Sequence, residues 1–599
     1  MSLELNESQV AAWRAVCALW GGEDALTELT STAVHKLTND VGAIGWKTYL
    51  PPDYLGRDRA LSIVLRAEYP HTPPELFVTP NPFLEWPHAE SNGKICLWPE
   101  DQVPAGLSSN ALVESAIAQF WEVFRLVNIG SSLQLRNDEF ALEWTSYWRI
   151  FKKPDFACSE QLLLLTKPGS EIALLSTGYL YTADLSATGE RRNRATFVVA
   201  DSDADRIMNW AVNSNIKADL TQDALALLIP LHAPPTRPGA PGTLDEIRNF
   251  ISTWASDPAQ ALSAFGNLIE QQLERPIWIV FSQINGAQAG LRLTHQYEKT
   301  KARGYQNSKA KRQANKKRRL IGFDVAVLTI QRGDPEWLQE RGFNPNYSDI
   351  ASRHVIVVGA GSLGSMVIEG LVLSGVGRQT LVDPGFFEAA NVGRHTLGVA
   401  SIGQSKVFAL RTRLLADYPH LVIEPKNKRI QEMREWLQNS DADLVICTTA
   451  DPASEAFLMN CLSLEDIPSL MISWSEPHAL AGHSAHSPGG SFALEHLFQS
   501  GECVSPVTEW AVSPTHQLPG CGASHIPGGG NRIRLISAMV VEHAVSVLLG
   551  ERGVGEHRMW AEASDIVKYY GGKRKVPIKD GDAAVIRSSV PKVKHSDDF

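Results

Sequence analysis

A glycine-rich turn between an apolar run and a helical pattern is the feature that most restricts how this chain can fold. Gly359, Gly361 and Gly364 follow the run HVIVV and open the segment SMVIEGLVLSGVG. This spacing allows a tight strand-to-helix turn in which phosphate oxygens approach the helix N-terminus. Strand and helix patterns alternate further through RQTLVD, ADLVICTTAD and IPSLMIS. The sequence therefore predicts a largely parallel, doubly wound α/β sheet with a nucleotide-binding turn.

The rest of the chain shows a different pattern. A length of 599 residues is too great for one hydrophobic core. Residues 1–150 combine alternating segments such as SIVLRAEYP with helical stretches such as SAIAQFWEVFRLV, which predicts an α+β domain. We expect an α+β middle domain at 151–335, and the α/β domain with a polar C-terminal tail at 336–599.

Composition narrows the class of protein. The net charge of −10 argues against a surface built to hold nucleic acid. The N-terminus MSLELNESQV has no basic or apolar leader pattern and no apolar run is long enough to span a bilayer, so we expect a cytoplasmic protein. The seven cysteines include no CxxC pair, which excludes a disulfide framework and a paired-thiolate zinc site. Any functional cysteine is then expected to act as a reduced thiol.

One segment is strongly basic, although the chain as a whole carries a net negative charge. Residues 299–319 hold ten Lys or Arg and no acidic residue. The segment could be an arm that binds nucleic acid or an acidic partner, or a solvated loop. Its one aromatic residue, Tyr305, offers little for base stacking, which favours the loop.

Polar residues after the glycine turn indicate which nucleotide chemistry is present. Asp383 ends the next strand, where a carboxylate can hold ribose hydroxyls, but this much also fits an NAD-binding domain. Further on stand Asn391 and Arg394 in NVGRH, Lys406 in GQSK and Asp451 after DLVICTTA. In order and spacing, these residues resemble the activating domain of the ThiF and MoeB family, which includes the ubiquitin-activating enzymes.

The resemblance implies that this domain adenylates a carboxylate with ATP and Mg²⁺. Arg394 and Lys406 would neutralise the triphosphate, with Arg394 counted among the catalytic residues. Asp383 would hold the ribose, Asp451 would hold Mg²⁺, and Asn391 would line the same nucleotide site.

Two positions depart from the family pattern. Gly385 stands where many relatives repeat an acidic residue, and His395 replaces a frequent glutamine. The paired CxxC zinc site of many relatives is also absent. We therefore expect ribose or metal contacts that differ in detail.

A second motif lies near the N-terminus, where YPHTPPELFVTP is followed by WPHAESNGKICLWPED. The residues that carry the pattern are Tyr69, Pro70, Pro73, Pro74, Gly93, Ile95, Cys96 and Leu97. They resemble the conjugating enzymes of the ubiquitin system, in which the cysteine carries an acyl group as a thioester. The resemblance implies that Cys96 is the carrier, whereas the alternative is a buried structural thiol.

The tripeptide before this cysteine is altered. Trp86, Pro87 and His88 occupy the place of the family's His-Pro-Asn, so His88 stands where an asparagine would support the oxyanion. A histidine could donate a hydrogen bond, perturb the thiol or relay a proton. It could equally only hold the loop, and the sequence leaves both alternatives open.

A thioester relay to Cys96 normally passes through a cysteine of the activating domain. Cys447 lies in an apolar strand and Cys461 in an apolar helical pattern, so both are predicted to be core residues. Cys521 lies in the glycine-rich loop HQLPGCGASHIPGGG, where a thiol can be exposed. We predict Cys521 as the relay thiol and Cys503 as the alternative.

The complete arrangement resembles the activating and conjugating fusions of bacterial CBASS antiphage operons. The resemblance implies adenylation of the C-terminus of a cGAS-like nucleotidyltransferase, relay through Cys521 to Cys96, and ligation to a target lysine. It also implies a homodimer built through the activating domain. The alternatives are conjugation of a ubiquitin-like protein, a sulfur-carrier adenylyltransferase, an NAD-binding oxidoreductase, or an inactive scaffold.

Overall fold

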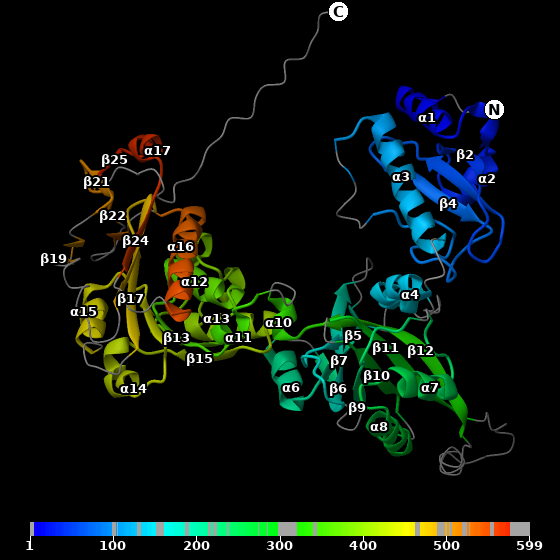
Figure 1. Ribbon diagram of the computed structural model, residues 1–599. Coiled ribbons are helices and arrows are strands. Elements are labelled where there is room, and N and C mark those ends of the chain that lie inside the picture. Colours follow the sequence, from blue (N-terminus) through cyan, green and yellow to red (C-terminus); the bar gives the residue numbers. More distant parts are fainter. Residues whose placement is uncertain are drawn as a thin grey trace, which may run out of the picture. The chain divides into compact units, whose positions relative to one another are not determined.

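The computed structural model divides into two compact units (Figure 1). The N-terminal unit comprises Met1–Leu162, Pro168–Leu175 and Ala224–Ile330, and the C-terminal unit comprises Leu163–Lys167, Ser176–Asp223 and Gln331–Phe599. The domain boundaries at 150 and 335 stay a prediction. The structure describes residues 5–98, 104, 106–128, 133–150, 161–185, 191–213, 217–219, 225–236, 239–272, 275–283, 286–297, 320–339, 344–461, 468–487, 498–499, 502–503, 506–517, 524–525, 528–550 and 556–575.

The N-terminal unit begins with an antiparallel sheet in the order β1-β2-β3-β4. Its elements are α1 (Glu7–Leu19), η1 (Glu23–Ala25), β1 (Thr27–Glu28), α2 (Ser31–Thr38), β2 (Ile44–Leu50), β3 (Arg59–Leu65), β4 (Glu75–Thr79) and α3 (Ser109–Asn128). Asn6 and Gln9 form a capping box that starts α1. Helix α3 buries an apolar stripe of helical period against this sheet. These elements make the α+β domain that the sequence predicts.

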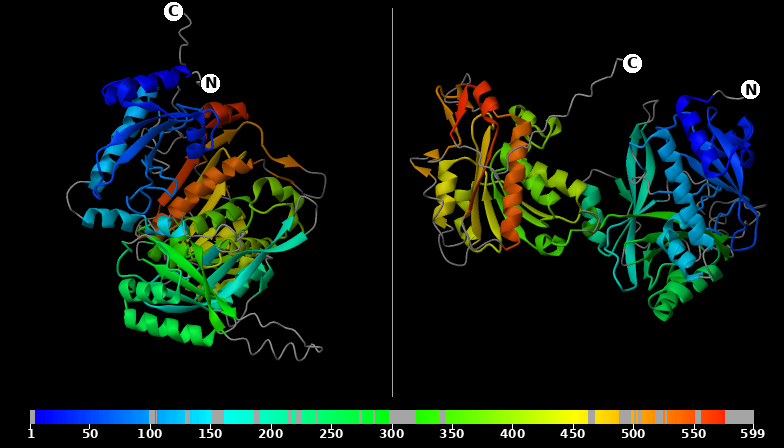
Figure 2. Two further views of the ribbon diagram at one scale, coloured as in Figure 1. Left: turned by 90° about the vertical axis from the view of Figure 1, so that its right-hand side faces the viewer. Right: turned by 45° about the horizontal axis from the view of Figure 1, so that its top comes forward.

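Four helices and four strands of a second sheet also belong to this unit. They are α4 (Leu133–Leu142), α5 (Trp144–Ile150), β9 (Leu225–Pro230), α7 (Leu244–Trp254), α8 (Pro258–Gln271), β10 (Ile277–Ser282), β11 (Gln288–Tyr297) and β12 (Leu320–Arg332). The strands pair in the order β12-β11-β10-β9, and α7 and α8 pack against them (Figure 2). Trp144 and Trp148 of α5 belong to the same core. Helix α5 therefore packs against the second sheet.

The C-terminal unit is built on a seven-stranded sheet in the order β15-β14-β13-β16-β17-β18-β24. The strands are β13 (His354–Val358), β14 (Arg378–Val382), β15 (Val422–Lys426), β16 (Leu444–Cys447), β17 (Ser469–Ser475), β18 (Ala481–Ser487) and β24 (Glu556–Ala561). Pairing is parallel from β15 to β17 and antiparallel through β18 and β24. The predicted doubly wound sheet is confirmed.

Both faces of this sheet are covered by helices (Figure 1). Helices α12 (Ser362–Leu373), α13 (Lys406–Asp417) and α16 (Gly530–Leu548) share one core with the strands. Elements η6 (Ile430–Met433), α14 (Arg434–Gln438) and α15 (Pro452–Cys461) share the core on the other face. Parallel strands buried on both faces read as continuous apolar runs, which explains HVIVV and LVIC.

Further helices and strands complete the described structure. They are β5 (Gln161–Leu164), β6 (Ala173–Leu185), β7 (Arg191–Asp201), α6 (Ala204–Asn213), β8 (Lys217–Asp219), α10 (Pro335–Leu338), α11 (Tyr347–Ala351), η4 (Ala389–Arg394), η5 (Val399–Ser401), β19 (Phe498–Gln499), β20 (Glu502–Cys503), β21 (Thr508–Trp510), β22 (His516–Gln517), β23 (Ser524–His525), α17 (Ser564–Tyr569) and β25 (Gly572–Arg574). No helix within the described ranges is long and apolar enough to cross a membrane.

Candidate functional site

A pocket of about 570 Å³ lies where strands β13, β14 and β16 end. The carboxyl edge of a parallel sheet is the usual ligand-binding edge of such folds. Five of the sequence-predicted residues line this pocket: Gly359, Gly361, Asp383, Lys406 and Asp451. The fold therefore brings together residues that are up to 92 positions apart in the chain.

The three glycines of the turn serve different purposes. Gly359 has a φ of +95°, a conformation that favours glycine. A Cβ on Gly364 would lie 1.9 Å from the carbonyl oxygen of Gly359, so this glycine lets α12 pack against the turn. Gly361 is different, because it lines the pocket and a Cβ there would meet no atom within 4 Å. The space beside Gly361 is open to a ligand.

This open space fits a phosphate group. Gly361 precedes α12, and no side chain of the described structure caps that helix. The first N–H groups of the helix are then available to an anion, which the helix dipole also favours. Lys406, Lys428 and Arg429 add three basic side chains to the pocket lining. These N–H groups and basic side chains suit the phosphates of a nucleoside triphosphate.

The glycines give a matched pair of variants. We expect Gly364→Ala to lower the free energy of unfolding of the C-terminal unit by roughly 2 kcal/mol or more, because its Cβ overlaps a backbone oxygen. Gly361→Ala should leave stability within about 0.5 kcal/mol and weaken ATP binding at least tenfold, because its methyl group fills the phosphate space. Hydrogen exchange of α12 amides and ATP titration measure the two effects. Equal ATP affinity in Gly361→Ala and wild type would contradict the phosphate assignment.

Asp383 is held rigidly beside the turn. Its Oδ2 accepts the N–H of Ala360 at 2.7 Å, and its Oδ1 accepts the N–H of Gly385 at 2.6 Å. A Cβ on Gly385 would lie 2.8 Å from Asp383 Oδ1 and 3.2 Å from Lys406 Nζ. The departure at Gly385 therefore leaves room for Lys406 to approach Asp383.

Asp451 caps the helix on the far side of the pocket. Its Oδ2 accepts the Oγ–H of Ser454 at 2.6 Å and the N–H of Ser454 at 3.0 Å. These hydrogen bonds, with a smaller effect of the Arg429 charge, lower the pKa of Asp451. In the part of the chain that the structure describes, no three His, Cys, Asp or Glu side chains form a group that could hold a metal. Mg²⁺ in proteins is often held by one or two carboxylates together with water and phosphate oxygens, so a single carboxylate such as Asp451 is compatible with such an ion.

Asn391 and Arg394 lie on η4 and do not line the pocket. The Oδ1 of Asn391 accepts the N–H of Glu388 at 2.9 Å, so this side chain caps its own helix. His395 ties the end of η4 to the glycine turn, because its Nε2 donates to the carbonyl of Ala360 at 2.8 Å and its Nδ1 accepts the N–H of Leu397 at 3.0 Å. Burial lowers the pKa of His395, in keeping with this neutral ring. The roles assigned to Asn391 and Arg394 stay predictions.

Sequence reasoning overlooked several pocket residues. Lys428 and Arg429 follow β15, and Thr448 and Thr449 follow β16. The signal was present, since basic residues in KNKRI come directly after a strand-like run at the same carboxyl edge. These cations raise the positive charge available to phosphates.

Cys96 lies on the surface of the N-terminal unit. Its side chain is exposed between buried Ile95 and Leu97, and its Sγ lies 3.6 Å from the carbonyl oxygen of Trp98. The segment is fixed to β4, because the N–H of Ile95 donates to Leu76 O at 2.8 Å. Gly93 starts the segment with a φ of +87°, and a Cβ there would meet Val78 O at 2.9 Å. An exposed thiol on a fixed backbone suits a carrier, whereas a core thiol would be buried.

His88 is joined to the backbone of Cys96. Its carbonyl accepts the N–H of Cys96 at 2.7 Å, and its own N–H donates to Tyr147 Oη at 3.0 Å. The ring Nδ1 lies 3.0 Å from Glu143 Oε1, and the ring Nε2 lies 3.1 Å from Glu139 Oε2. Nothing in the local sequence indicated these partners, which lie more than 50 positions away. The contacts favour the loop-holding interpretation of His88, and its catalytic role stays a prediction.

The C-terminal unit holds four cysteines that the sequence offers as the relay thiol. Cys447 and Cys461 are buried, as predicted, and burial raises the pKa of Cys447 to about 12. Neither can act as a surface thiolate at neutral pH. Cys503 ends β20, which pairs with β19. Cys521 and the basic segment 299–319 lie outside the described residues, so the choice of relay thiol stays a prediction.

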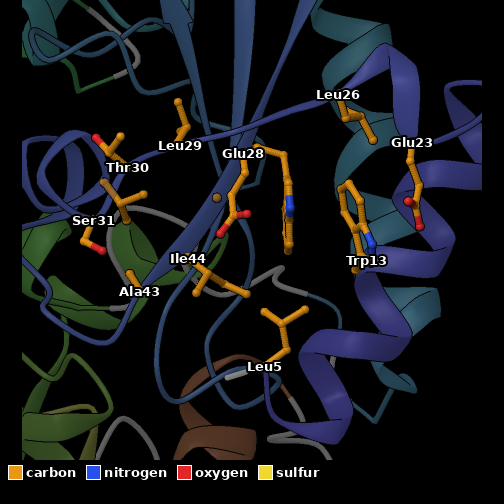
Figure 3. A pocket seen from close by; sticks show the side chains of 13 residues that line it. Leu5, Trp13, Glu23, Leu26, Glu28, Leu29, Thr30, Ser31, Ala43 and Ile44 are labelled. Carbon is orange, nitrogen blue, oxygen red and sulfur yellow. The ribbon is translucent and has the colours of Figure 1, made fainter. Parts of the chain in front are cut away.

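A second pocket, of about 820 Å³, lies in the N-terminal unit (Figure 3). Trp13 and Trp46 stack beside it with ring centroids 4.7 Å apart, and Glu23 and Glu28 contribute carboxylates. None of the sequence-predicted site residues lines it. The larger volume of this pocket therefore does not make it the predicted site, because the predicted residues line the smaller pocket beside the glycine turn.

The two regions that carry these sites match known families. Residues 338–563 match the ThiF family, and residues 36–157 match the Prokaryotic E2 family B. The chain therefore joins a prokaryotic E2 domain and a ThiF domain. The predicted fusion of a conjugating and an activating domain is confirmed.

Individual proteins resemble parts of the chain. One is the ATP-dependent ubiquitin transferase-like protein Cap2 of Enterobacter hormaechei subsp. hoffmannii (strain UCI 50), 33% identical over 155 residues, which are 25% of this chain and 26% of that protein. Another is ubiquitin-like modifier-activating enzyme 5 of Dictyostelium discoideum, 27% identical over 228 residues, which are 35% of this chain and 57% of that protein. Both matches cover less than two thirds of the relative's length.

Among solved structures, TcdA (CsdL) aligns with a TM-score of 0.28 at 15% identity, covering 35% of this chain and 90% of that one.

Proposed function

We propose that this protein is an ATP-dependent, ubiquitin-transferase-like enzyme that activates a protein carboxylate and passes it on as a thioester. The observation that carries the proposal is the presence of two complementary sites in one chain. A cationic pocket stands at the carboxyl edge of the ThiF sheet, and an exposed cysteine stands on a fixed loop of the E2 domain. Activation without a carrier would leave such chemistry incomplete.

The residues suggest how the first step proceeds. The glycine turn and the N-terminus of α12 would bind phosphates, Asp383 would orient the ribose, and Lys406 would offset charge on the triphosphate. Lys428 and Arg429 would assist it, and Arg394 would join from η4. Mg²⁺ at Asp451 would supply further charge neutralisation of the phosphates. The attacking carboxylate would then form an acyl adenylate and release pyrophosphate.

The second step would carry the acyl group to lysine. A thiolate of the ThiF domain, Cys521 or alternatively Cys503, would attack the adenylate and release AMP. Exchange with the Cys96 thiolate would move the thioester to the E2 domain, and a lysine amine would take it as an isopeptide. We propose His88 as a residue that supports this transfer.

The finer assignment concerns the substrate. We propose the C-terminus of a cGAS-like nucleotidyltransferase, acting in CBASS antiphage defence, with a homodimer formed through the ThiF domain. Its support is the fusion itself and the likeness to proteins named Cap2. A ubiquitin-like protein is the alternative substrate.

Exchange of pyrophosphate into ATP tests the activation step. With a cGAS-like nucleotidyltransferase present, we expect exchange that disappears when its C-terminal residue is removed. Lys406→Ala should lower the rate about 100-fold, because it removes a preorganised positive charge. Lys36→Ala, on the exposed side of α2, serves as the matched control. Tight NAD binding without exchange would overturn the proposal, and exchange without any adduct on Cys96 would favour a sulfur-carrier adenylyltransferase.

A further inference from the structure

The backbone of His88 adopts a conformation that side chains disfavour. Its φ is +61°, in the left-handed region, which only a few per cent of residues other than glycine adopt, although Asn, Asp and His are enriched among them. Such a conformation persists only where surrounding contacts impose it. Four contacts do so here: those of the His88 N–H, its carbonyl and its two ring nitrogens.

The partners of the ring determine its charge. A neutral imidazole has one N–H, so the contacts with Glu139 and Glu143 are both hydrogen bonds only when the ring is protonated. Burial lowers the pKa of His88, but the hydrogen bonds and charges of Glu143 and Glu139 outweigh burial and raise it. A ring engaged in this way is neither a proton acceptor nor an oxyanion donor.

The partners are themselves firmly placed. Tyr147 is buried, donates to Glu143 Oε2 at 3.2 Å and packs edge-on against Phe140. On the same helix, Trp144 Nε1 donates to Gln283 Oε1 at 3.0 Å, and Trp148 Nε1 donates to the carbonyl of Gly290 at 3.1 Å. All these residues belong to the N-terminal unit. A continuous set of contacts thus connects the second sheet, through α5, to the loop of Cys96.

We propose that Glu139, Glu143 and Tyr147 are positioning residues for Cys96. They hold His88 in its left-handed conformation, so that its carbonyl fixes the Cys96 N–H and the thiol stays presented at the surface. His88 acts through its charge and shape and takes no proton from the reacting groups. This inference rests on the proposed carrier role of Cys96, and it makes the second sheet part of the frame of the carrier site.

The test uses the full chain and four variants. Tyr147→Phe removes the acceptor of the His88 N–H, and the double variant Glu139→Gln/Glu143→Gln removes both charges from the ring. Exposed residues give matched controls: Tyr49→Phe on β2, and Glu122→Gln on α3. Hydrogen exchange of peptides covering 86–97 reports on the loop. Loading of Cys96 by ATP and a cGAS-like nucleotidyltransferase reports on transfer.

We expect faster amide exchange confined to 86–97 and about tenfold slower loading in Tyr147→Phe and in the double variant, with pyrophosphate exchange unchanged. The controls should match wild type. Loading and loop exchange within twofold of wild type in both test variants would overturn the inference.

Two further variants separate positioning from proton relay. Asparagine tolerates the left-handed region and can donate to one carboxylate, but it does not titrate near neutral pH. His88→Asn should therefore load Cys96 within about threefold of wild type, whereas His88→Leu should fall at least tenfold. Equal losses in both variants would assign the role to ring chemistry instead. If wild type itself forms no thioester on Cys96 while loop exchange still responds as expected, the carrier proposal fails and the positioning contacts stand.

Discussion

Cys96→Ala is expected to abolish ligation to lysine while pyrophosphate exchange stays within about twofold of wild type. The substitution removes the Sγ nucleophile. The neighbouring residues Ile95 and Leu97 are buried and apolar, so neither can act as a nucleophile in its place. Since the side chain is exposed, stability should change by less than about 0.5 kcal/mol. Mass spectrometry of the co-expressed nucleotidyltransferase measures the product. Ligation that continues in Cys96→Ala would contradict the carrier role.

Substitutions of single cysteines locate the acyl group along the relay. Cys96→Ser should accumulate an oxygen ester that survives thiol reagents, whereas an added thiol takes the acyl group from the wild-type thioester and releases the free Cys96 thiol. Cys521→Ala should prevent loading of Cys96 without affecting adenylation, and Cys503→Ala should load normally. The opposite result for these two variants would make Cys503 the relay thiol. Cys17→Ala, in α1, is the matched control, because this half-buried thiol has no assigned role.

The carboxyl edge of the sheet was predictable because its signals are local. Gly359 and Asp383 directly follow apolar strands, and Asp451 comes four residues after the end of β16. Parallel strands place such positions together. Arg394 shows the limit of this reasoning. It lies on a short helix whose place depends on the capping by Asn391 and on the bond of His395 to the turn. Those contacts form only in the folded protein, and no periodic pattern in the sequence predicts them.

The surroundings of Cys96 also combine features that the sequence predicts with contacts that it does not. The motif around Cys96 was recognisable in the sequence, but the exposure of its thiol, which the sequence left open, is established by the structure. The partners of His88 come from α4, from α5 and from Glu143 between them, and no local pattern connects a loop to residues that follow it by more than 50 positions. Long-range polar contacts are therefore the part of the site that only the structure supplies. They also decide which of the two sequence interpretations of His88 the geometry favours.

Arg59→Met is expected to lower the free energy of unfolding of the N-terminal unit by about 3–5 kcal/mol. Arg59 is buried on β3, and its Nε donates to the buried carboxylate of Asp53 at 2.8 Å. It also bonds Glu85 at 2.5 Å and the Pro80 carbonyl at 2.6 Å. Methionine would leave the Asp53 charge buried without its partner. Native-state hydrogen exchange of β3 amides in the full chain measures the loss.

Arg57→Met is the matched control for this loss. Arg57 pairs with the same Glu85 but is 52% exposed, and exposed ion pairs contribute about 1 kcal/mol or less. A fall in stability of similar size in both variants would show that the buried pair has no special weight.

The contribution of Asp53 to the pH dependence of stability should change sign between wild type and Arg59→Met. Burial raises the pKa of Asp53, but hydrogen bonds from Arg57, Arg59 and Leu55 outweigh burial and lower it. A lowered folded-state pKa stabilises the protein above the unfolded value of about 3.9, and this contribution is lost as the pH falls through the folded value. In Arg59→Met, unpaired burial should instead raise the pKa of Asp53, so the variant gains stability on acidification. The same slope in both proteins would mean that Asp53 is not held by Arg59, and that the loop before Trp86 and His88 is supported by other contacts.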